Sequence, residues 1–266
     1  MPGQSKIRSV NADWPPVRGY VLSDDKFDNG PQGWGQLIDS TSPRGPISLD
    51  TYGAIGKYAL TVQTENQAET SSAGWSTAMA IKRLTRWKGD GRYMMEVWWG
   101  WASQSDKTRP RAFEFGIDTE GADSDSRRFY KFRWLNYDEN SSTRVTKWQM
   151  QTGSEASSAF TDVPGGTMDL PYNENKRNLV YTAMVFDLGS GVYDGLQVNS
   201  YLKLGSLADT PDSSLRAYSV QTSTLADYVH GMNLCCVIRN RTNAAKTKAL
   251  LHIARVRCQY LGPSPS

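Results

Sequence analysis

The chain has 266 residues and a nearly balanced charge, with 30 Lys and Arg against 27 Asp and Glu and a formal net charge of +3. A balance this close to neutral does not indicate a nucleic-acid partner or an anionic membrane surface. No apolar window approaches the roughly 18 residues that a membrane span needs, so no membrane partner is predicted. The aromatic content of 11% and the many Gly, Ser and Thr residues favour strands and turns over helices.

Residues 1–18 are polar and lack the apolar core of a secretory signal. Within them Trp14 precedes Pro15 and Pro16, and consecutive prolines favour an extended conformation. Two interpretations stay open: a disordered tail, or an arm that packs on a neighbouring subunit with Trp14 as its anchor. The polar start predicts a cytoplasmic protein, one exported without a classical signal, or one released as part of a virion.

Apolar residues spaced by two positions predict short strands through the rest of the chain. The first strands are expected at Gly19–Asp28, Ile47–Tyr52, Tyr58–Gln63 and Trp75–Leu84. A central block, Gly89–Gln151, is predicted to contain the next ones at Arg92–Trp101, Arg111–Asp118, Arg128–Tyr137 and Thr146–Gln151. Residues 152–178 are expected to form a loop, because Pro164, Gly165, Gly166 and Pro171 interrupt the pattern.

The last part of the chain continues the same pattern. Strands are expected at Leu179–Leu188, Val192–Val198, Tyr201–Leu204, Arg216–Gln221, Met232–Arg239 and Ala249–Tyr260. The first two are predicted to form a hairpin around the Gly-rich turn at residues 189–191. Because no long helical pattern alternates with these strands, the sequence predicts an all-β sandwich or barrel.

Five of the nine tryptophans lie in the central block. Successive side chains of a strand point to opposite faces, and each strand of the block has one apolar and one polar face. Trp99, Trp134 and Trp148 fall on the apolar side, while Trp101 shares that parity at the strand end and could reach the rim. These strands are predicted to form one consistent sheet, whose polar face shows Glu96, Trp98, Glu114, Lys131, Arg133 and Gln149.

Two segments resemble the concanavalin A-like lectin/glucanase jelly rolls, including the laminin-G-like domains. Residues 91–99, Gly-Arg-Tyr-Met-Met-Glu-Val-Trp-Trp, are similar to the family's G-x-Y-x-x-E-x-x-h strand. Residues 185–193, Val-Phe-Asp-Leu-Gly-Ser-Gly-Val-Tyr, resemble its paired strands around an Asp-rich turn, running on to Asn199. The strand at Leu250–Arg257 is similar to its last sheet strand. More loosely, the chain resembles jelly-roll minor tail or accessory virion proteins of tailed bacteriophages.

The resemblance implies a two-sheet antiparallel jelly-roll sandwich of the concanavalin A-like type. It would cover residues 19–261 as a single domain, between the arm at 1–18 and a C-terminal tail at 262–266. It also implies, in many members, glycan contact on a sheet face or its rim. It does not imply an enzyme.

The polar residues of the predicted face suit a sugar ligand. Sugars present hydroxyls to acids, amides and Arg, and C–H faces to an aromatic ring such as Trp98. The alternative is a solvated sheet with cross-strand charge pairs, such as Glu114 with Lys131, each contributing roughly a few tenths of a kcal/mol.

Glycosidase chemistry would need two carboxyl groups, for which Glu96 and Glu114 are the candidates. The glucanases that the chain resembles carry Glu-x-Asp-x-x-Glu in one strand, and here the acids after Glu96 are missing. Lys131 and Arg133 would also keep carboxyl groups ionised, which opposes a general acid. With only His230 and His252 and no Gly-x-Ser-x-Gly, a catalytic triad has little basis either. We therefore predict no enzyme and no catalytic residues, with a divergent glycoside hydrolase as an alternative.

No cofactor is predicted, with calcium as an alternative. Asp118, Glu120, Asp123 and Asp125 offer closely spaced oxygens, and the resembled jelly rolls often bind calcium, but the loop lacks the residue order of a calcium loop. The three cysteines are interpreted as small buried hydrophobes rather than metal ligands or disulfides.

The sequence thus predicts a non-enzymatic, lectin-like module that binds a glycan or a protein neighbour. A structural or adhesion component of a phage virion, acting in an assembly or homo-oligomer through its N-terminal arm, is the predicted setting. A purely structural assembly protein is the other alternative.

Overall fold

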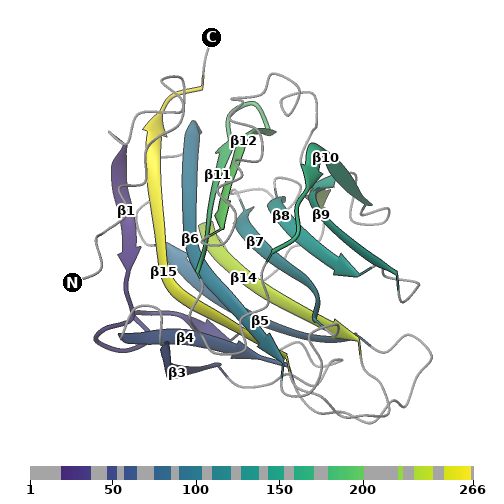
Figure 1. The fold of residues 1–266 in the computed structure, drawn as a ribbon. Coiled ribbons are helices and arrows are strands. Elements are labelled where there is room, and N and C mark those ends of the chain that lie inside the picture. The colour runs from purple at the N-terminus through teal and green to yellow at the C-terminus, as the bar shows by residue number, and fades with distance from the viewer. Residues whose placement is uncertain are drawn as a thin grey trace.

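The protein is described by a computed structural model, and the described residues are 19–36, 47–52, 57–64, 75–84, 90–103, 110–120, 127–137, 143–152, 159–170, 179–200, 221–223, 231–241 and 249–264. All regular structure within these ranges is β-strand (Figure 1). In the same ranges we find no helix with the length and apolar character that crossing a membrane requires. The predicted arm, residues 1–18, lies outside the described residues.

The strands form two antiparallel sheets. One contains β1 (Tyr20–Asp25), β3 (Ile47–Tyr52), β4 (Lys57–Gln63), β6 (Arg92–Ser103), β11 (Val180–Asp187), β12 (Val192–Ser200) and β15 (Ala249–Gly262). This seven-stranded sheet has the order β12-β11-β6-β15-β4-β3, with β1 also pairing to β15.

The other sheet contains β2 (Gly35–Gln36), β5 (Trp75–Leu84), β7 (Pro110–Glu120), β8 (Arg127–Tyr137), β9 (Arg144–Thr152), β10 (Ala159–Thr167), β13 (Gln221–Ser223) and β14 (Gly231–Arg241). This eight-stranded sheet has the order β10-β9-β8-β7-β14-β5-β2, with β13 pairing to β8. The predicted all-β, two-sheet antiparallel sandwich is confirmed.

The expected loop at residues 152–178 is wrong in part, because β10 occupies residues 159–167 and runs through Pro164. β10 is the last strand of its sheet, and an edge strand tolerates proline because one side of its backbone needs no ladder partner. Its register with β9 shifts between Asp162 and Thr167, and Gly165 there has a φ of 66°. The Pro-Gly-Gly segment is therefore an irregularity within an edge strand. The strands expected at 201–204 and 216–220 lie outside the described residues.

The core lies between the sheets and is rich in aromatic side chains. The ring of Trp99, on β6, lies 5.2 Å from that of Phe113, 4.9 Å from that of Phe115 and 6.5 Å from that of Trp148. These partners belong to the opposite sheet, so the contacts join the two layers. The predicted core positions of Trp99, Trp134 and Trp148 are confirmed. Trp101 does not reach a rim: it is 1% exposed, with its ring 6.0 Å from that of Trp134.

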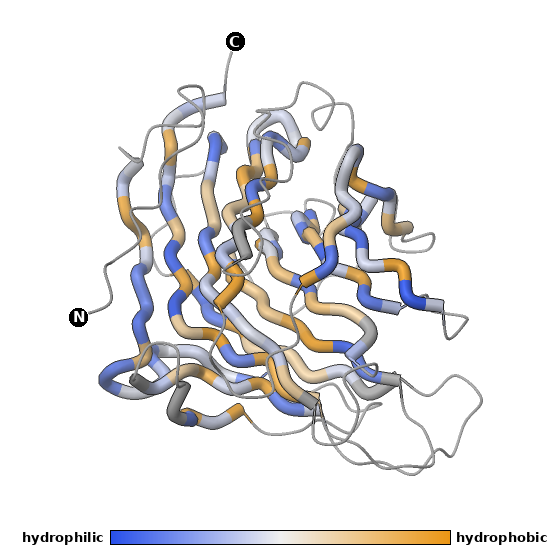
Figure 2. The backbone as a smooth tube through the Cα atoms, viewed as in Figure 1, coloured by the Kyte–Doolittle hydropathy of each residue, from blue (hydrophilic) through white to orange (hydrophobic). Residues whose placement is uncertain are grey.

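Figure 2 shows that hydrophobic and hydrophilic positions succeed one another along the strands. His252 and the three cysteines are all buried. His252 Nδ1 lies 2.9 Å from Thr61 Oγ1, which agrees with a structural role. Cys236 and Cys258 belong to the core between the sheets, as the prediction of buried hydrophobes expects.

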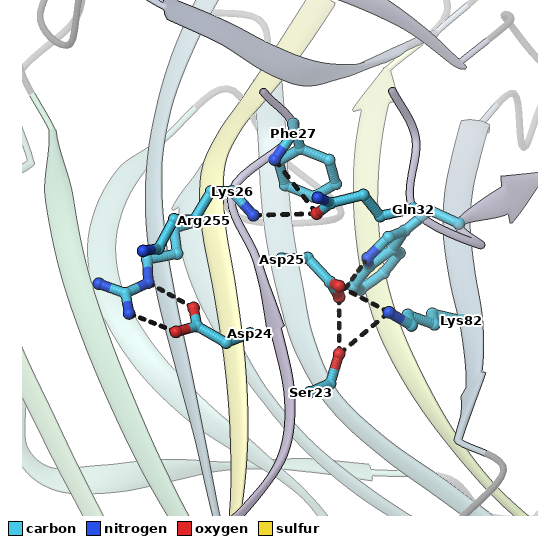
Figure 3. A network of polar contacts seen from close by, with 9 residues as sticks. Ser23, Asp24, Asp25, Lys26, Phe27, Gln32, Lys82 and Arg255 are labelled. Atoms are coloured by element: carbon cyan, nitrogen blue, oxygen red, sulfur yellow. Dashed lines mark hydrogen bonds and ion pairs between the residues drawn. The ribbon is translucent and has the colours of Figure 1, made fainter. Parts of the chain in front are cut away.

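A buried polar cluster also links the sheets, at the edge where β1 faces β5 (Figure 3). Lys82 Nζ, from β5, donates to Asp25 Oδ1 at 2.6 Å and to Ser23 Oγ at 3.0 Å. Trp34 Nε1 donates to Asp25 Oδ2 at 3.0 Å, which ties the loop after β1 to the same carboxylate. Gln32 Oε1 accepts from the backbone N–H groups of Lys26 and Phe27, closing that loop.

Trp99→Ala tests the aromatic layer. We expect it to lower the free energy of unfolding by about 3–5 kcal/mol, because it opens a cavity between the sheets. It also leaves the buried hydroxyl of Thr182 without the 3.0 Å bond from Trp99 Nε1. Urea denaturation gives the value. Tyr58→Ala, at a half-exposed side chain, is the control and should change it by less than about 0.5 kcal/mol. Equal losses in the two variants would contradict the assignment.

Lys82→Met tests the polar link. Without the ammonium, the buried Asp25 carboxylate loses its cation, and we expect a loss of about 3 kcal/mol in urea denaturation. Arg255→Met is the matched control. Arg255 pairs with Asp24, the neighbour of Asp25 on β1, and the side chains of both partners are about one third exposed. Its cost should stay below about 1 kcal/mol. A control as costly as Lys82→Met would show that the inter-sheet position of the pair does not matter.

Candidate functional site

The structure divides the six predicted site residues between two faces. Glu96 and Trp98 lie on β6, in the seven-stranded sheet, whereas Glu114, Lys131, Arg133 and Gln149 lie on β7, β8 and β9 of the eight-stranded sheet. All six have the parity opposite to the core residues of their strands, so each group lies on its sheet's outer face. The expectation of one common polar face is wrong, because strand parity identifies a face but not the sheet to which a strand belongs.

The same division separates Glu96 from Glu114. Stacked sheets lie about 10 Å apart, and side chains on opposite outer faces are farther apart still. The two carboxyl groups of a glycosidase lie within about 5–9.5 Å of each other. Glu96 and Glu114 therefore cannot act as such a pair.

The outer face of the seven-stranded sheet holds Glu96 in a closed set of contacts. Glu96 accepts from the hydroxyl of Tyr181 at 2.9 Å and from Gln259 Nε2 at 2.7 Å, and Arg257 lies 3.7 Å from it. Burial, then the Glu96 carboxylate, raises the pKa of Tyr181 well above its ordinary value. Both oxygens of Glu96 thus have partners within the protein.

Trp98 lies beside this set. Its ring is tilted against that of Tyr181 at 4.9 Å, and the guanidinium of Arg255 lies 4.9 Å from its centroid. Arg255 also makes two 2.7 Å hydrogen bonds to Asp24, which lower the pKa of that carboxyl (Figure 3). Side chains of the protein therefore contact the indole of Trp98 on this face.

The outer face of the eight-stranded sheet carries a row of polar side chains at right angles to its strands. We call this the polar row: Glu114, Arg133, Gln149 and Asp162, which are register partners across β7, β8, β9 and β10. Arg133 Nε donates to Gln149 Oε1 at 2.7 Å, and Gln149 Nε2 donates to Asp162 Oδ1 at 2.6 Å. The row is thus connected by hydrogen bonds from β8 to β10.

Cations hold both ends of the polar row. Glu114 Oε1 lies 2.6 Å from Arg239 Nε on β14, and Lys147 Nζ donates to Asp162 Oδ2 at 2.8 Å. The expected pair of Glu114 with Lys131 is wrong, because the register places Lys131 opposite Gly116 and Glu114 opposite Arg133. The strand order, in which β14 lies beside β7, could not be predicted from the sequence, so Arg239 was not expected as the partner of Glu114.

Lys131 lies next to the polar row, two residues before Arg133 on β8. Its ammonium is 5.1 Å from the ring centroid of Phe129, and Arg127 covers the same ring at 4.5 Å. Arg127 in turn makes two hydrogen bonds to Asp118, at 2.9 and 3.1 Å. Within the described part of the chain, the Lys131 ammonium has neither a hydrogen bond nor an ion pair.

The backbone beneath Lys131 is fixed from the opposite sheet. The hydroxyl of Tyr193, on β12, lies 3.2 Å from the N–H of Lys131 and donates to the carbonyl of Gln151 at 2.5 Å. A Cβ at Gly116 would lie 1.9 Å from the carbonyl oxygen of Tyr130, so only glycine fits opposite Lys131. No side chain of β7 therefore stands beside Lys131 on this face.

These polar residues are unusually buried for the outer face of a sheet. Exposed fractions are 1% for Glu114, 4% for Arg133, 6% for Gln149 and 8% for Lys131. Burial alone raises the pKa of Glu114, but Arg239, and then Lys131 and Arg133, lower it, and the net direction is down. Glu114 is therefore a carboxylate at neutral pH and cannot donate a proton as a general acid.

Several residues of this face were not singled out from the sequence. Asp162 and Phe160 lie in the segment expected to be a loop, and Arg239 ends a predicted strand whose neighbours were unknown. The guanidinium of Arg133 lies 3.5 Å from the ring centroid of Phe160. One signal for Arg239 was present in the sequence. It shares the parity of Cys235 and Val237 on its strand, so these three side chains point to the same face.

No group of three or more His, Cys, Asp or Glu that could hold a metal ion occurs among the residues that the structure describes. In the acidic segment, both oxygens of Asp118 accept from Arg127, while Asp123 and Asp125 lie outside the described residues. Asp118, with its oxygens engaged this way, does not fit the calcium ligand that the segment suggested.

Comparison with solved structures identifies the class of fold. The lectin UEA-II, complexed with galactose, has a TM-score of 0.50 at 9% identity, covering 89% of this chain and 98% of that chain. The exoplasmic/lumenal domain of VIP36 in its Ca²⁺/Man3GlcNAc-bound form has a TM-score of 0.49 at 10% identity, covering 93% and 92%. Alginate lyase A1-II′ has a TM-score of 0.42 at 10% identity, covering 86% and 94%. The likeness to UEA-II shows a concanavalin A-like, lectin-type sandwich.

Comparison of the sequence with models of protein families identifies the family of the chain. The chain belongs to the family described as Domain of unknown function (DUF6772), whose model matches residues 42–246. No curated protein matches the sequence.

Glu114→Gln tests the electrostatics of the polar row. The pKa of Glu114 is lowered on folding, so its charge contributes stability above the unfolded-state pKa of about 4.3, and this contribution is lost as the pH falls. We expect the variant to be less stable by about 1–3 kcal/mol at pH 7 in urea denaturation, with a smaller difference at pH 4.

Asp169→Asn is the control for this variant. Asp169 pairs with Arg144 at a site where both side chains are about half exposed, so its loss should cost less than about 1 kcal/mol at either pH. A Glu114→Gln deficit that is equally large at pH 4 would contradict an ionised Glu114 as the stabilising species.

Proposed function

We propose that the protein is a carbohydrate-binding module and that it binds glycan on the outer face of the eight-stranded sheet, at the polar row and Lys131. The observation that carries this proposal is the polar row across β7 to β10, in which Glu114, Arg133 and Gln149 are buried. Hydrogen bonds connect Arg133, Gln149 and Asp162. The proposal retains Glu114, Lys131, Arg133 and Gln149 from the sequence prediction and adds Asp162.

The geometry of the row suits an oligosaccharide. Adjacent strands lie about 4.7–4.9 Å apart, so a chain of sugars lying along the row would meet a new strand with each unit. Carboxylate, guanidinium and amide groups alternate there, and these are the partners that sugar hydroxyls require. The half-buried rings of Phe129 and Phe160 flank the row and could stack on C–H faces.

The energetics also favour a functional role. A buried ionic network is commonly no more stable than well-packed apolar residues of the same volume, and it is often less stable. The polar row therefore contributes little that an apolar surface would not, and a ligand is a reason for its presence. On the other face, Glu96 and Trp98 already contact Tyr181, Gln259 and Arg255.

The likeness to UEA-II supports the proposal as an analogy of fold, since that lectin is complexed with galactose. The ionised state of Glu114 supports a binding role over general acid catalysis. The setting in a virion or outside the cell, and assembly through residues 1–18, remain predictions from the sequence.

A glycan array with two variants tests which face binds. We expect the wild-type protein to retain a defined set of glycans, Arg133→Met to lose at least tenfold in affinity, and Trp98→Ala to bind within about threefold of wild type. Circular dichroism of both variants checks the fold. The reverse pattern would move the site to the seven-stranded sheet, and no binding by the wild-type protein would contradict the proposal.

A further inference from the structure

We infer that the glycan carries an anionic substituent, a carboxylate or a sulfate ester, and that Lys131 binds it. This inference rests on the proposed function and specifies the chemistry of its ligand. The ligand charge would complete a set of ion pairs in which Lys131 has no partner among the described residues.

The charge pattern of the face points to Lys131. Each described carboxylate of this face has its own cation: Asp118 has Arg127, Glu114 has Arg239 and Asp162 has Lys147. Lys131 has no such partner in the described ranges, although it is 92% buried. A buried ammonium without a counter-ion is unfavourable, and an anionic ligand group would remove that deficit.

The described neighbours of the Lys131 ammonium include no carboxylate that pairs with it. The register partner of Lys131 on β7 is Gly116, which has no side chain to cover the ammonium. On the other side, Phe129 supports the ammonium through its ring face, which leaves the N–H donors of Lys131 available. The ammonium therefore has the aromatic ring of Phe129 beside it, and β7 contributes only backbone opposite Lys131.

Arg133 extends the same subsite. Residues 131 and 133 point to the same face of β8, about 6.6 Å apart along the strand. The guanidinium of Arg133 is oriented by Gln149 Oε1 and by the ring of Phe160. The geometry thus places two cations within reach of one sugar, with Lys131 as the point charge and Arg133 as the oriented donor.

The structure also limits repulsion of an anion. The nearest carboxylate in the row, Glu114, is ionised but lies 2.6 Å from Arg239. Counting described side chains on this face, cations outnumber carboxylates: Arg83, Arg127, Lys131, Arg133, Lys147 and Arg239 stand against Glu114, Asp118 and Asp162. The described side chains of this face therefore carry a net positive charge, which favours an anionic ligand.

Matched oligosaccharides test this inference by titration calorimetry. The probes are uronate oligomers (galacturonate, mannuronate and guluronate), their carboxyl-reduced forms, and sulfated galactan oligomers. We expect at least one anionic series to bind ten- to a hundredfold more tightly than its neutral counterpart, which is the effect of one charge-assisted hydrogen bond. Preference for the uronates identifies a carboxylate ligand, and preference for the galactans identifies a sulfate.

Three variants assign the preference to Lys131. Lys131→Met should abolish it, and Lys131→Arg should retain it within about threefold. Arg83→Met is the control, because it removes one positive charge from the same face at an exposed position on β5, outside the polar row, and it should retain the preference. Thermal melts of all three verify folding.

The outcomes separate this inference from the proposed function. Equal binding of anionic and neutral oligomers, lost in Arg133→Met, would overturn the anionic ligand and leave the carbohydrate site in place. An anionic preference that survives Lys131→Met would overturn the role of Lys131. If neither the array nor the calorimetry detects any glycan, both proposals fail.

Discussion

The structure depends on the contact between two sheets through aromatic side chains. Trp99 of β6 reaches Phe113 and Phe115 on β7 and Trp148 on β9 of the facing sheet, so burial of one ring holds two strands of the opposite layer. Successive side chains of a strand point to opposite faces. The residues that pack in this aromatic core therefore determine which of their neighbours face outward. The polar row and the surroundings of Trp98 are both consequences of that choice, on opposite sides of the molecule.

The two outer faces use polar residues differently. On the seven-stranded sheet, Glu96 has a partner for each oxygen, and Trp98 packs against Tyr181. On the eight-stranded sheet, the connected row leaves the ammonium of Lys131 without a counter-ion in the described part of the chain. A closed network mainly stabilises a fold, whereas an open one retains capacity to interact with something else. This difference, rather than the number of polar residues, distinguishes the face that we propose to bind glycan.

Local alternation predicted most strands and the side on which each tryptophan lies, because a period of two is a property of a single strand. It could not predict that β6 and β7, neighbours in sequence, belong to different sheets, so Glu96 and Glu114 were assigned to one face. Pro164 predicted a loop, since the edge position that tolerates it follows only from the sheet order. The partnership of Glu114 with Arg239 spans more than a hundred residues, and nothing in either local sequence indicates it. Site residues on one strand were thus predictable, and their partners were not.

The hydroxyl of Tyr193 has a further consequence. It comes from the seven-stranded sheet, yet it takes the place of a ladder bond between β8 and β9, whose register pairs begin at the next position, Phe132 with Met150. The position of the Lys131 backbone is therefore fixed in part by a hydrogen bond to the opposite sheet of the sandwich. Any sliding of one layer over the other would move Lys131 relative to Arg133 and Gln149. If the polar row binds a glycan as we propose, changes at the distant β12 strand would alter ligand affinity without touching that face. The stiffness of the whole sandwich would then contribute to recognition.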